Sequence, residues 1–179
     1  MALSRLPLLP ALLALFPCSW SATCAAQCAP NWSPVPGLGS AGTVFAALPL
    51  PASRLAVGGV LQLVGGPAAS SGVVILDRTT GAWDPLAGGC DGPVAALAQL
   101  PNGDLVAGGS FQAAGGAPAN GIARWNGSAW LPFGSGATGG GSPTGVNALL
   151  VLPNGDLIAG GAFTQMDGVP AAGIARWNG

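Results

Sequence analysis

The sequence contains no histidine, lysine, glutamate or tyrosine, and its charged side chains are 6 aspartates and 5 arginines. General acid–base catalysis usually relies on the missing residue types, so only aspartate is left for it. Zinc sites commonly combine cysteine with histidine, which is absent. A formal net charge of −1 with scattered arginines offers no basic stripe for a phosphate backbone. We therefore expect a protein that is not an enzyme, uses no cofactor or metal, and does not bind nucleic acid.

Long apolar runs are scarce as well, apart from one run at the N-terminus. Arg5 precedes an apolar stretch at 6–16, and small residues follow it. This is the layout of a secretory signal peptide, and the run is too short to cross a bilayer as a helix. The sequence predicts a signal peptide over residues 1–26, with cleavage after Ala26 or, as a close second, Ala25. We expect a secreted or cell-surface protein with no membrane span after signal removal.

Cysteine is also rare. The sequence has 4 cysteines, and after the predicted cleavage only Cys28 and Cys90 remain. An oxidising compartment favours a disulfide between them. Two unpaired thiols are the open alternative, because a sequence does not show whether two cysteines meet.

Glycine and proline are abundant, with 31 and 17 residues, and without a period this composition would indicate disorder. However, residues 94–127 match residues 146–179 at 23 of 34 positions with a constant offset of 52, and a fainter copy lies at 44–59. Such a period makes the repeat the unit of structure. The predicted segments are an N-terminal segment with an outer-strand motif (27–43), repeat 1 (44–93), repeat 2 (94–145) and repeat 3 (146–179), which lacks its own outer strand.

Each repeat reads as four short strands separated by turns, and repeat 2 shows this best. The paired glycines Gly108 and Gly109 let a neighbouring backbone or aromatic ring come close, and Pro132 suits an edge strand. The dipeptide Asn126-Gly127 favours a two-residue hairpin turn. Four strands in about fifty residues are typical of a propeller blade. The predicted strands cover 94–100, 105–111, 121–125 and 128–133, with a tight turn at 101–104 and a loose segment at 112–120.

A tryptophan followed two residues later by proline marks the outer strand. The segments LVAGG with IARWNGSAWLPF, and LAVGG with VVILDRTTGAWDPL, resemble kelch-type and related secreted propeller repeats of bacterial cell-surface proteins and fungal cortical marker proteins. The resemblance covers 32–179; it implies an all-β fold, a β-propeller built of four-stranded blades, and no particular activity. The motif occurs as Trp32 with Pro34, Trp83 with Pro85, and Trp130 with Pro132.

Repeat 3 ends before an outer strand of its own, and the N-terminal segment carries one. We expect an incomplete propeller of about three blades, part of a longer one. Two alternatives stay open. The N-terminal strand could complete repeat 3 in a closed three-bladed ring, or short arcs could assemble with one another.

An aspartate and an arginine recur 20 residues apart in two of the repeats. Asp104 precedes Arg124, and Asp156 precedes Arg176, whereas repeat 1 has neither member. A ring of carboxylates for Ca²⁺ or a sugar is one interpretation. The joint absence in repeat 1 favours an ion pair within each repeat, with nitrogen and oxygen no more than about 4 Å apart.

The tryptophans beside these arginines, Trp125 and Trp177, point to the opposite face of the strand because side chains alternate along it. They could stack on sugars, but a recurring tryptophan in a blade is more often packing between sheets. We assign them, with Phe111 and Phe163, to the core.

The loops 112–120 and 164–172 differ most between repeats 2 and 3, and variable loops on a regular scaffold are where binding sites occur. We expect a secreted, non-enzymatic propeller that serves as a binding or structural scaffold at the cell surface and presents a protein or glycan site on its loops. The alternative is a noncatalytic fragment of a larger propeller-containing enzyme.

Overall fold

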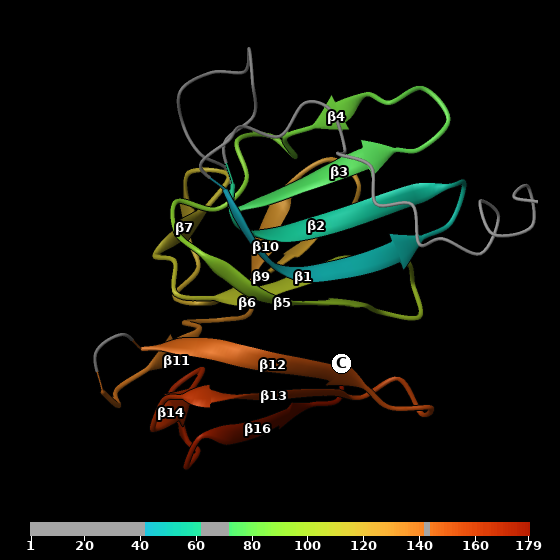
Figure 1. Cartoon of the computed structure of the whole chain (residues 1–179). Helices are drawn as coiled ribbons and strands as arrows, with labels where there is room; N and C mark the ends of the chain where they lie inside the picture. The colour runs from blue at the N-terminus through green and yellow to red at the C-terminus, as the bar shows by residue number, and fades with distance from the viewer. Residues whose placement is uncertain (1–41, 62–71, 142–143) are drawn as a thin grey trace, which may run out of the picture. The chain divides into compact units, whose positions relative to one another are not determined.

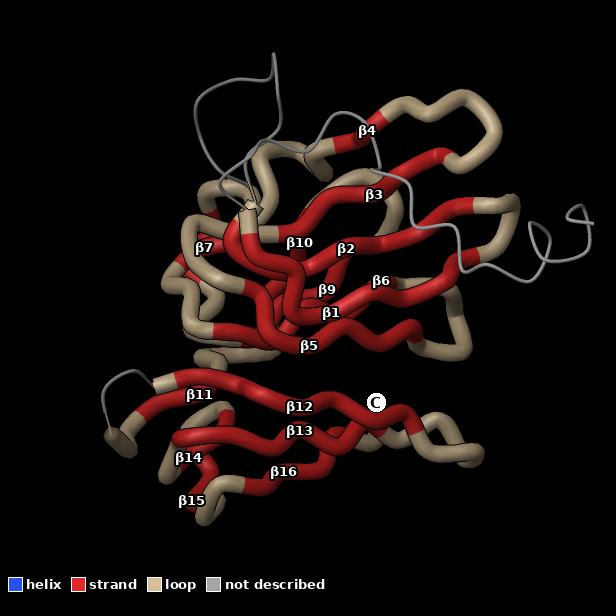
Figure 2. Tube along the Cα trace, viewed as in Figure 1, coloured by secondary structure: helices blue, strands red, loops and turns tan. Residues whose placement is uncertain are grey.

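The computed structural model describes residues 42–61, 72–141 and 144–179, all of which belong to one compact unit, Val35–Gly179. The described residues form sixteen β-strands (Figures 1 and 2). In these ranges, no helix is long and apolar enough to cross a bilayer. The predicted signal peptide, Cys28 and the Trp32 motif lie outside the described residues.

Repeat 1 forms a four-stranded antiparallel sheet. The last two strands make a hairpin, in which the Asp77 N–H donates to the Ala82 carbonyl at 2.9 Å. The carboxylate of Asp77 accepts hydrogen bonds from the Thr79 hydroxyl and from the backbone N–H groups of Thr79 and Thr80, and these bonds lower its pKa. In chain and sheet order the strands are β1 (Thr43–Leu50), β2 (Arg54–Val60), β3 (Val73–Asp77) and β4 (Trp83–Asp84).

Repeat 2 confirms the predicted four strands, each somewhat shorter than expected. The outer strand lies at the edge of the sheet, where Pro132 removes no ladder hydrogen bond. The preceding turn is centred one residue later than predicted, because the Asn126 N–H pairs with the Ala129 carbonyl at 3.2 Å and Gly127 has a φ of +99°. From the inside outwards the strands are β5 (Val94–Gln99), β6 (Leu105–Gly109), β9 (Ile122–Trp125) and β10 (Trp130–Pro132).

Repeat 3 repeats the register of repeat 2 with three described strands. Leu157 pairs with Trp177 as Leu105 pairs with Trp125. Equal register is expected from equal hydrophobic patterns, because a slip of one residue would turn every side chain to the other face. The strands are β12 (Gly145–Val151), β13 (Leu157–Ala162) and β16 (Ile174–Trp177).

The segments expected to be loose contain small hairpins, which corrects the prediction. In repeat 2, Gly115 and Gly116 adopt positive φ angles of 56° and 81°, which glycine reaches without strain, so the chain reverses within two residues. The hairpins are β7 (Ala113–Ala114) with β8 (Ala117–Pro118), and β14 (Gln165–Met166) with β15 (Val169–Pro170); β11 (Ala137–Thr138) extends the second one.

The core consists mainly of two apolar clusters, one between the sheets of repeats 1 and 2 and one between those of repeats 2 and 3. Alternation along β6 divides the strand between them: Leu105 and Ala107 join the first cluster, and Val106 joins the second. Phe111 and Phe163 are buried, as predicted. Each repeat therefore completes its core only by contact with its neighbours.

The first of the paired glycines forms a hole that a valine of the next repeat fills. A Cβ added at Gly58 would lie 2.8 Å from Val94 Cγ1, and one added at Gly108 would lie 2.8 Å from Val146 Cγ1. We call the position of Gly58, Gly108 and their equivalent the glycine hole, and the inserting residue the knob valine. The predicted close approach of a neighbouring backbone is present at the second glycine, Gly109, where an added Cβ would meet the backbone of Pro93. At the first glycine the approaching side chain is a valine and not the aromatic ring that was the other expectation.

Candidate functional site

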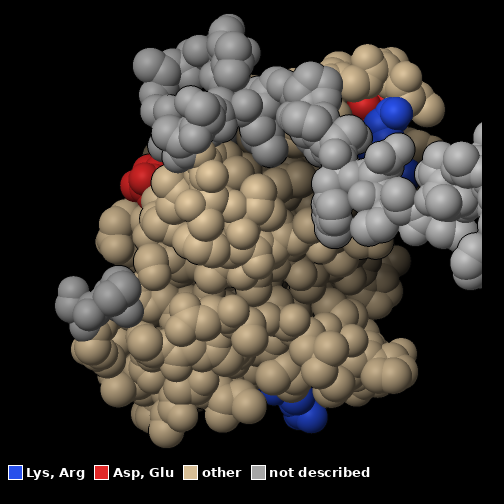
Figure 3. All heavy atoms as spheres, viewed as in Figure 1, with Lys and Arg blue, Asp and Glu red and all other residues tan. Residues whose placement is uncertain are grey.

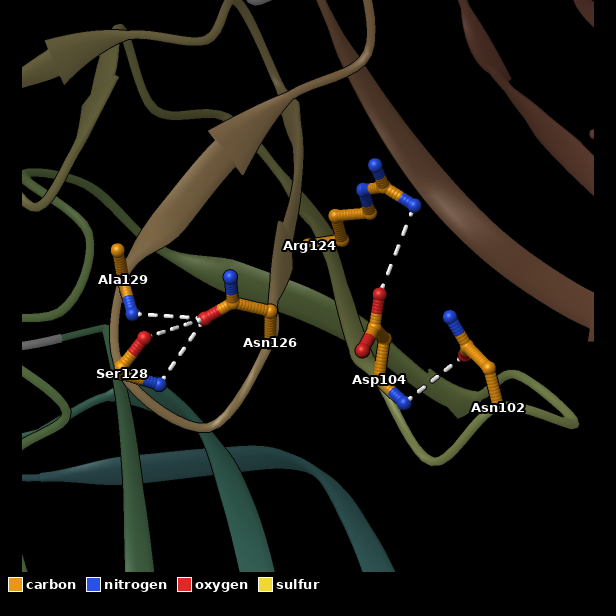
Figure 4. A network of polar contacts seen from close by, with 6 residues as sticks. All are labelled: Asn102, Asp104, Arg124, Asn126, Ser128 and Ala129. Carbon is orange, nitrogen blue, oxygen red and sulfur yellow. Dashed lines mark hydrogen bonds and ion pairs between the residues drawn. The ribbon is translucent and has the colours of Figure 1, made fainter.

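The two predicted ion pairs are present in the structure. Arg124 Nη1 lies 3.5 Å from Asp104 Oδ2 (Figure 4), and Arg176 Nη1 lies 3.6 Å from Asp156 Oδ2. The arginine side chains are 32% and 63% exposed, whereas both carboxylates are largely shielded. Each pair joins the start of the second strand to the third strand of its own repeat, so it holds the sheet together.

Cation-binding geometry is not found around these carboxylates. Within the described ranges, no three cysteine, aspartate or other metal-ligating acidic side chains converge. In Figure 4, Asp104 faces Arg124, and the backbone N–H of Asp104 donates a hydrogen bond to Asn102 Oδ1 in the turn, at 3.1 Å. This geometry fits turn chemistry and an ion pair.

The two tryptophans next to the arginines pack against aromatic rings. The Trp125 ring lies 5.6 Å from that of Trp130 at an interplanar angle of 53°, and the Trp177 ring lies 5.2 Å from that of Phe133 at 85°. Both angles are favourable for aromatic pairs. The contacts fit a packing role, but both tryptophans are only partly buried and pack against the apolar clusters, so the assignment to the core is corrected to its margin.

Cys90 is buried at the boundary of repeats 1 and 2, where it belongs to the first apolar cluster. Burial and, to a lesser degree, the neighbouring Asp91 raise the pKa of the Cys90 thiol to about 12. A thiol with such a pKa stays protonated at neutral pH and is a poor nucleophile. Because Cys28 lies outside the described residues, the disulfide with Cys90 stays a prediction.

The hairpin of repeat 2 is fixed to the last residues of repeat 1. Asp91 Oδ1 accepts hydrogen bonds from the backbone N–H groups of Gln112 at 2.8 Å and Ala113 at 2.9 Å, and the Gly115 N–H donates to the Gly89 carbonyl at 2.8 Å. Asp91 was not among the residues singled out from the sequence. Its role was not predictable, since the partners lie about twenty residues away along the chain.

The hairpin of repeat 3 is fixed at the equivalent positions, by two backbone hydrogen bonds and one bond to a side chain of its own. The Thr164 N–H donates to the Thr138 carbonyl at 3.1 Å, and the Asp167 N–H donates to the Gly136 carbonyl at 2.8 Å. In addition, Asp167 Oδ1 accepts from the Ser135 N–H at 2.8 Å. Two hairpins thus share one backbone frame.

The tips of the hairpins differ strongly in chemistry. Gly115 and Gly116 form the tip in repeat 2, whereas Asp167 and Gly168 form it in repeat 3, followed by Val169, which is 64% exposed. The molecular face in Figure 3 shows few charged atoms. A constant frame with variable tips is the usual arrangement of a binding surface.

The outer edge of repeat 2 is closed by Trp130. Its indole N–H donates to the Leu86 carbonyl at 2.8 Å, and the side chain is buried. A Cβ added at Gly115 would lie 2.9 Å from Trp130 Cδ1, so the ring sits directly on that glycine. In repeat 2, the Trp-x-Pro motif therefore supplies a plug for the edge of its sheet.

Repeat 3 has a hollow of about 490 Å³ at the equivalent place. Phe133, Asp167 and Trp177 line it, and they correspond to Leu86, Gly115 and Trp125, the three contacts of Trp130. No described residue plugs it. We call this space the tryptophan hollow; its lining also includes Leu157, Ala159, Ala171, Ala175 and Arg176.

Residues 100–127 match a family model described as a domain of unknown function (DUF5122) beta-propeller. The matched part runs from the turn before β6 to the end of β9, which includes the ion pair and the hairpin of repeat 2. No curated protein and no solved structure matches the chain significantly. The match and the antiparallel sheets together show that this all-β chain contains β-propeller repeats.

Proposed function

We propose that this chain is a secreted, non-enzymatic β-propeller scaffold of the cell surface, and that the hairpins at 112–120 and 164–172 bind a protein or glycan. The observation that carries the proposal is the pair of hairpins with equal backbone frames and unequal tips. Rigid backbones reduce the conformational entropy lost on binding, so they favour a binding role for the side chains that they display.

The kelch-like character of the repeats and the signal-peptide layout of residues 1–26 belong to the same proposal. They support secretion and a surface location. The lack of histidine, glutamate and tyrosine in the sequence supports a non-enzymatic role.

A hairpin exchange tests the binding role. One variant carries residues 164–172 in both positions, and the reciprocal variant carries residues 112–120 in both. The exported chains are screened on a glycan array and against a panel of purified extracellular proteins. We expect a ligand that follows one hairpin, with binding gained or lost at least about tenfold while the melting temperature stays unchanged.

The matched control is Asn102→Ala, which alters a turn outside the hairpins. Binding that survives both exchanges and falls with this control would place the site elsewhere. The absence of any ligand for the chain would leave a purely architectural role and so refute the proposal.

A further inference from the structure

One face of the repeat 3 sheet is exposed. The equivalent face of the repeat 2 sheet is covered by repeat 3. Ile122 is 2% exposed, whereas its equivalent Ile174 is 64% exposed; Ala98 is 7% exposed, whereas Leu150 is 59% exposed. The glycine hole of this face, at Gly160, is empty, because no atom lies closer than 3.9 Å to a Cβ built there. This face is shaped to receive a knob valine.

Repeat 1 has a knob valine that no described residue receives. Val44 occupies the position of Val94 and Val146, and each of the three is followed by a register shift at the next pair. Val94 and Val146 are fully buried in glycine holes, whereas Val44 is 49% exposed. The described chain thus has one empty hole, in repeat 3, and one unused knob, in repeat 1.

The tryptophan of the Trp-x-Pro motif precedes a knob valine in each case. Trp83 precedes the knob Val94 by 11 residues, Trp130 precedes Val146 by 16, and Trp32 precedes Val44 by 12. In repeat 2, Trp130 closes the outer edge of the sheet while Val146 fills the glycine hole of that same sheet. By sequence position, Trp32 and Val44 form the same kind of pair, and such a pair requires one repeat with both an open hollow and an open glycine hole. Among the described residues, repeat 3 has both.

We propose that the occupant is a second copy of this chain, docked head to tail. The Trp32 of one copy plugs the tryptophan hollow of the other, with its indole N–H donating to the Phe133 carbonyl, and its Val44 fills the hole at Gly160. The same contacts made in return close a ring of two copies through two equal interfaces. Docking of Val44 on repeat 3 of the same chain would bury Val44 and Ile174, which are exposed in the single chain.

The oligomeric state tests this inference. The full chain, purified after bacterial export, is weighed by light scattering and native mass spectrometry over a range of concentrations. We expect a dimer, and we expect Gly160→Leu, Val44→Asp and Trp32→Ala each to weaken it at least about tenfold. The matched control is Gly141→Leu, because a Cβ at Gly141 meets no atom within 4 Å and its φ is ordinary.

A mixing experiment distinguishes head-to-tail docking from a symmetric contact between like faces. Gly160→Leu has a blocked hole and an intact knob, whereas Val44→Asp has an intact hole and a damaged knob. Each variant alone is expected to be monomeric, and an equal mixture is expected to form a 1:1 complex through one intact interface. Circular dichroism of each variant verifies folding, which is expected because both positions are exposed or open.

Three results would overturn the inference. The first is a monomeric wild-type chain at all concentrations, as expected if a further repeat in the same polypeptide occupies the face. The second is a dimer that is indifferent to the three substitutions. The third is a pair of variants that mixing does not restore. None of these results depends on whether the hairpins bind a ligand, so the two proposals fail separately.

Discussion

Repeats 2 and 3 contain the same strand, Ile-Ala-Arg-Trp, in the same register of the same kind of sheet. In repeat 2 its isoleucine is buried under β12, and in repeat 3 it faces solvent. The arginine is about half as exposed in repeat 2 as in repeat 3, although both form the same ion pair. The comparison teaches that the repeat determines which side chains can be buried, and that the neighbour determines whether they are.

The largest effect should come from making the edge of repeat 2 like that of repeat 3. Trp130→Ala empties the outer plug and is expected to lower the free energy of unfolding by about 3–5 kcal/mol, because a buried aromatic side chain leaves a cavity. Denaturant unfolding followed by circular dichroism measures it. Trp130→Phe is the control: it keeps a ring and loses the bond to the Leu86 carbonyl, which costs about 1 kcal/mol. Equal losses for both variants would contradict the packing role.

The second-largest effect is the difference in stability between substitutions at Ile122 and at Ile174. Ile122→Ala should destabilise the chain by about 2–5 kcal/mol, whereas Ile174→Ala should change stability by no more than about 0.5 kcal/mol. Both substitutions are made in the Val44→Asp background, so that association does not cover Ile174. Similar losses at the two positions would mean that the exposed face of repeat 3 is buried in the single chain.

The glycine holes give a smaller difference of the same kind. Gly108→Ala places a methyl group 2.8 Å from Val146 Cγ1 and is expected to cost about 1–3 kcal/mol through overpacking. Gly160→Ala meets open space in the single chain, so thermal unfolding at low concentration should show almost no change. A tolerant Gly108 would show that the sheets can move apart.

The smallest effect concerns the ion pairs, which double-mutant cycles can compare. Exposed pairs contribute about 0.2–1 kcal/mol, and the coupling of Asp104 with Arg124 should exceed that of Asp156 with Arg176, since Arg124 is better shielded from solvent. Salt should weaken both couplings. A stronger coupling in repeat 3, or one that is independent of salt, would reverse this part of the comparison.

Local features of the fold were predictable from the sequence because they depend on short-range rules. The four strands of repeat 2, the edge position of Pro132 and the burial of Phe111 follow from alternation, proline chemistry and a repeated apolar position. The ion pairs were predictable because both partners vary together between repeats. The turn at Gly127 was displaced by one residue, since the Asn126 side chain accepts three hydrogen bonds in the turn (Figure 4).

The frame of the candidate site was not predictable. Asp91 anchors the hairpin of repeat 2, whereas repeat 3 has Thr138 at the equivalent position. Because the aspartate does not recur, comparison of the repeats did not reveal its role. The hairpins themselves were missed because two-residue strands carry no periodicity. The tryptophan hollow has no sequence signature either. A cavity forms where packing leaves a space unfilled, and the sequence does not show how the sheets pack.

The sequence by itself determined the repeat, its strands, its turns and the pairing of its charges, because these depend on residues that are close in sequence or recur at a fixed spacing. Only the tertiary structure showed that the valine of one repeat enters the glycine hole of the previous one, and that none of the described residues occupies the hole of repeat 3. The physical reason is that burial is a property of a pair of surfaces. Each repeat specifies one surface of that pair, and the contact with a neighbour decides whether its apolar face is removed from water.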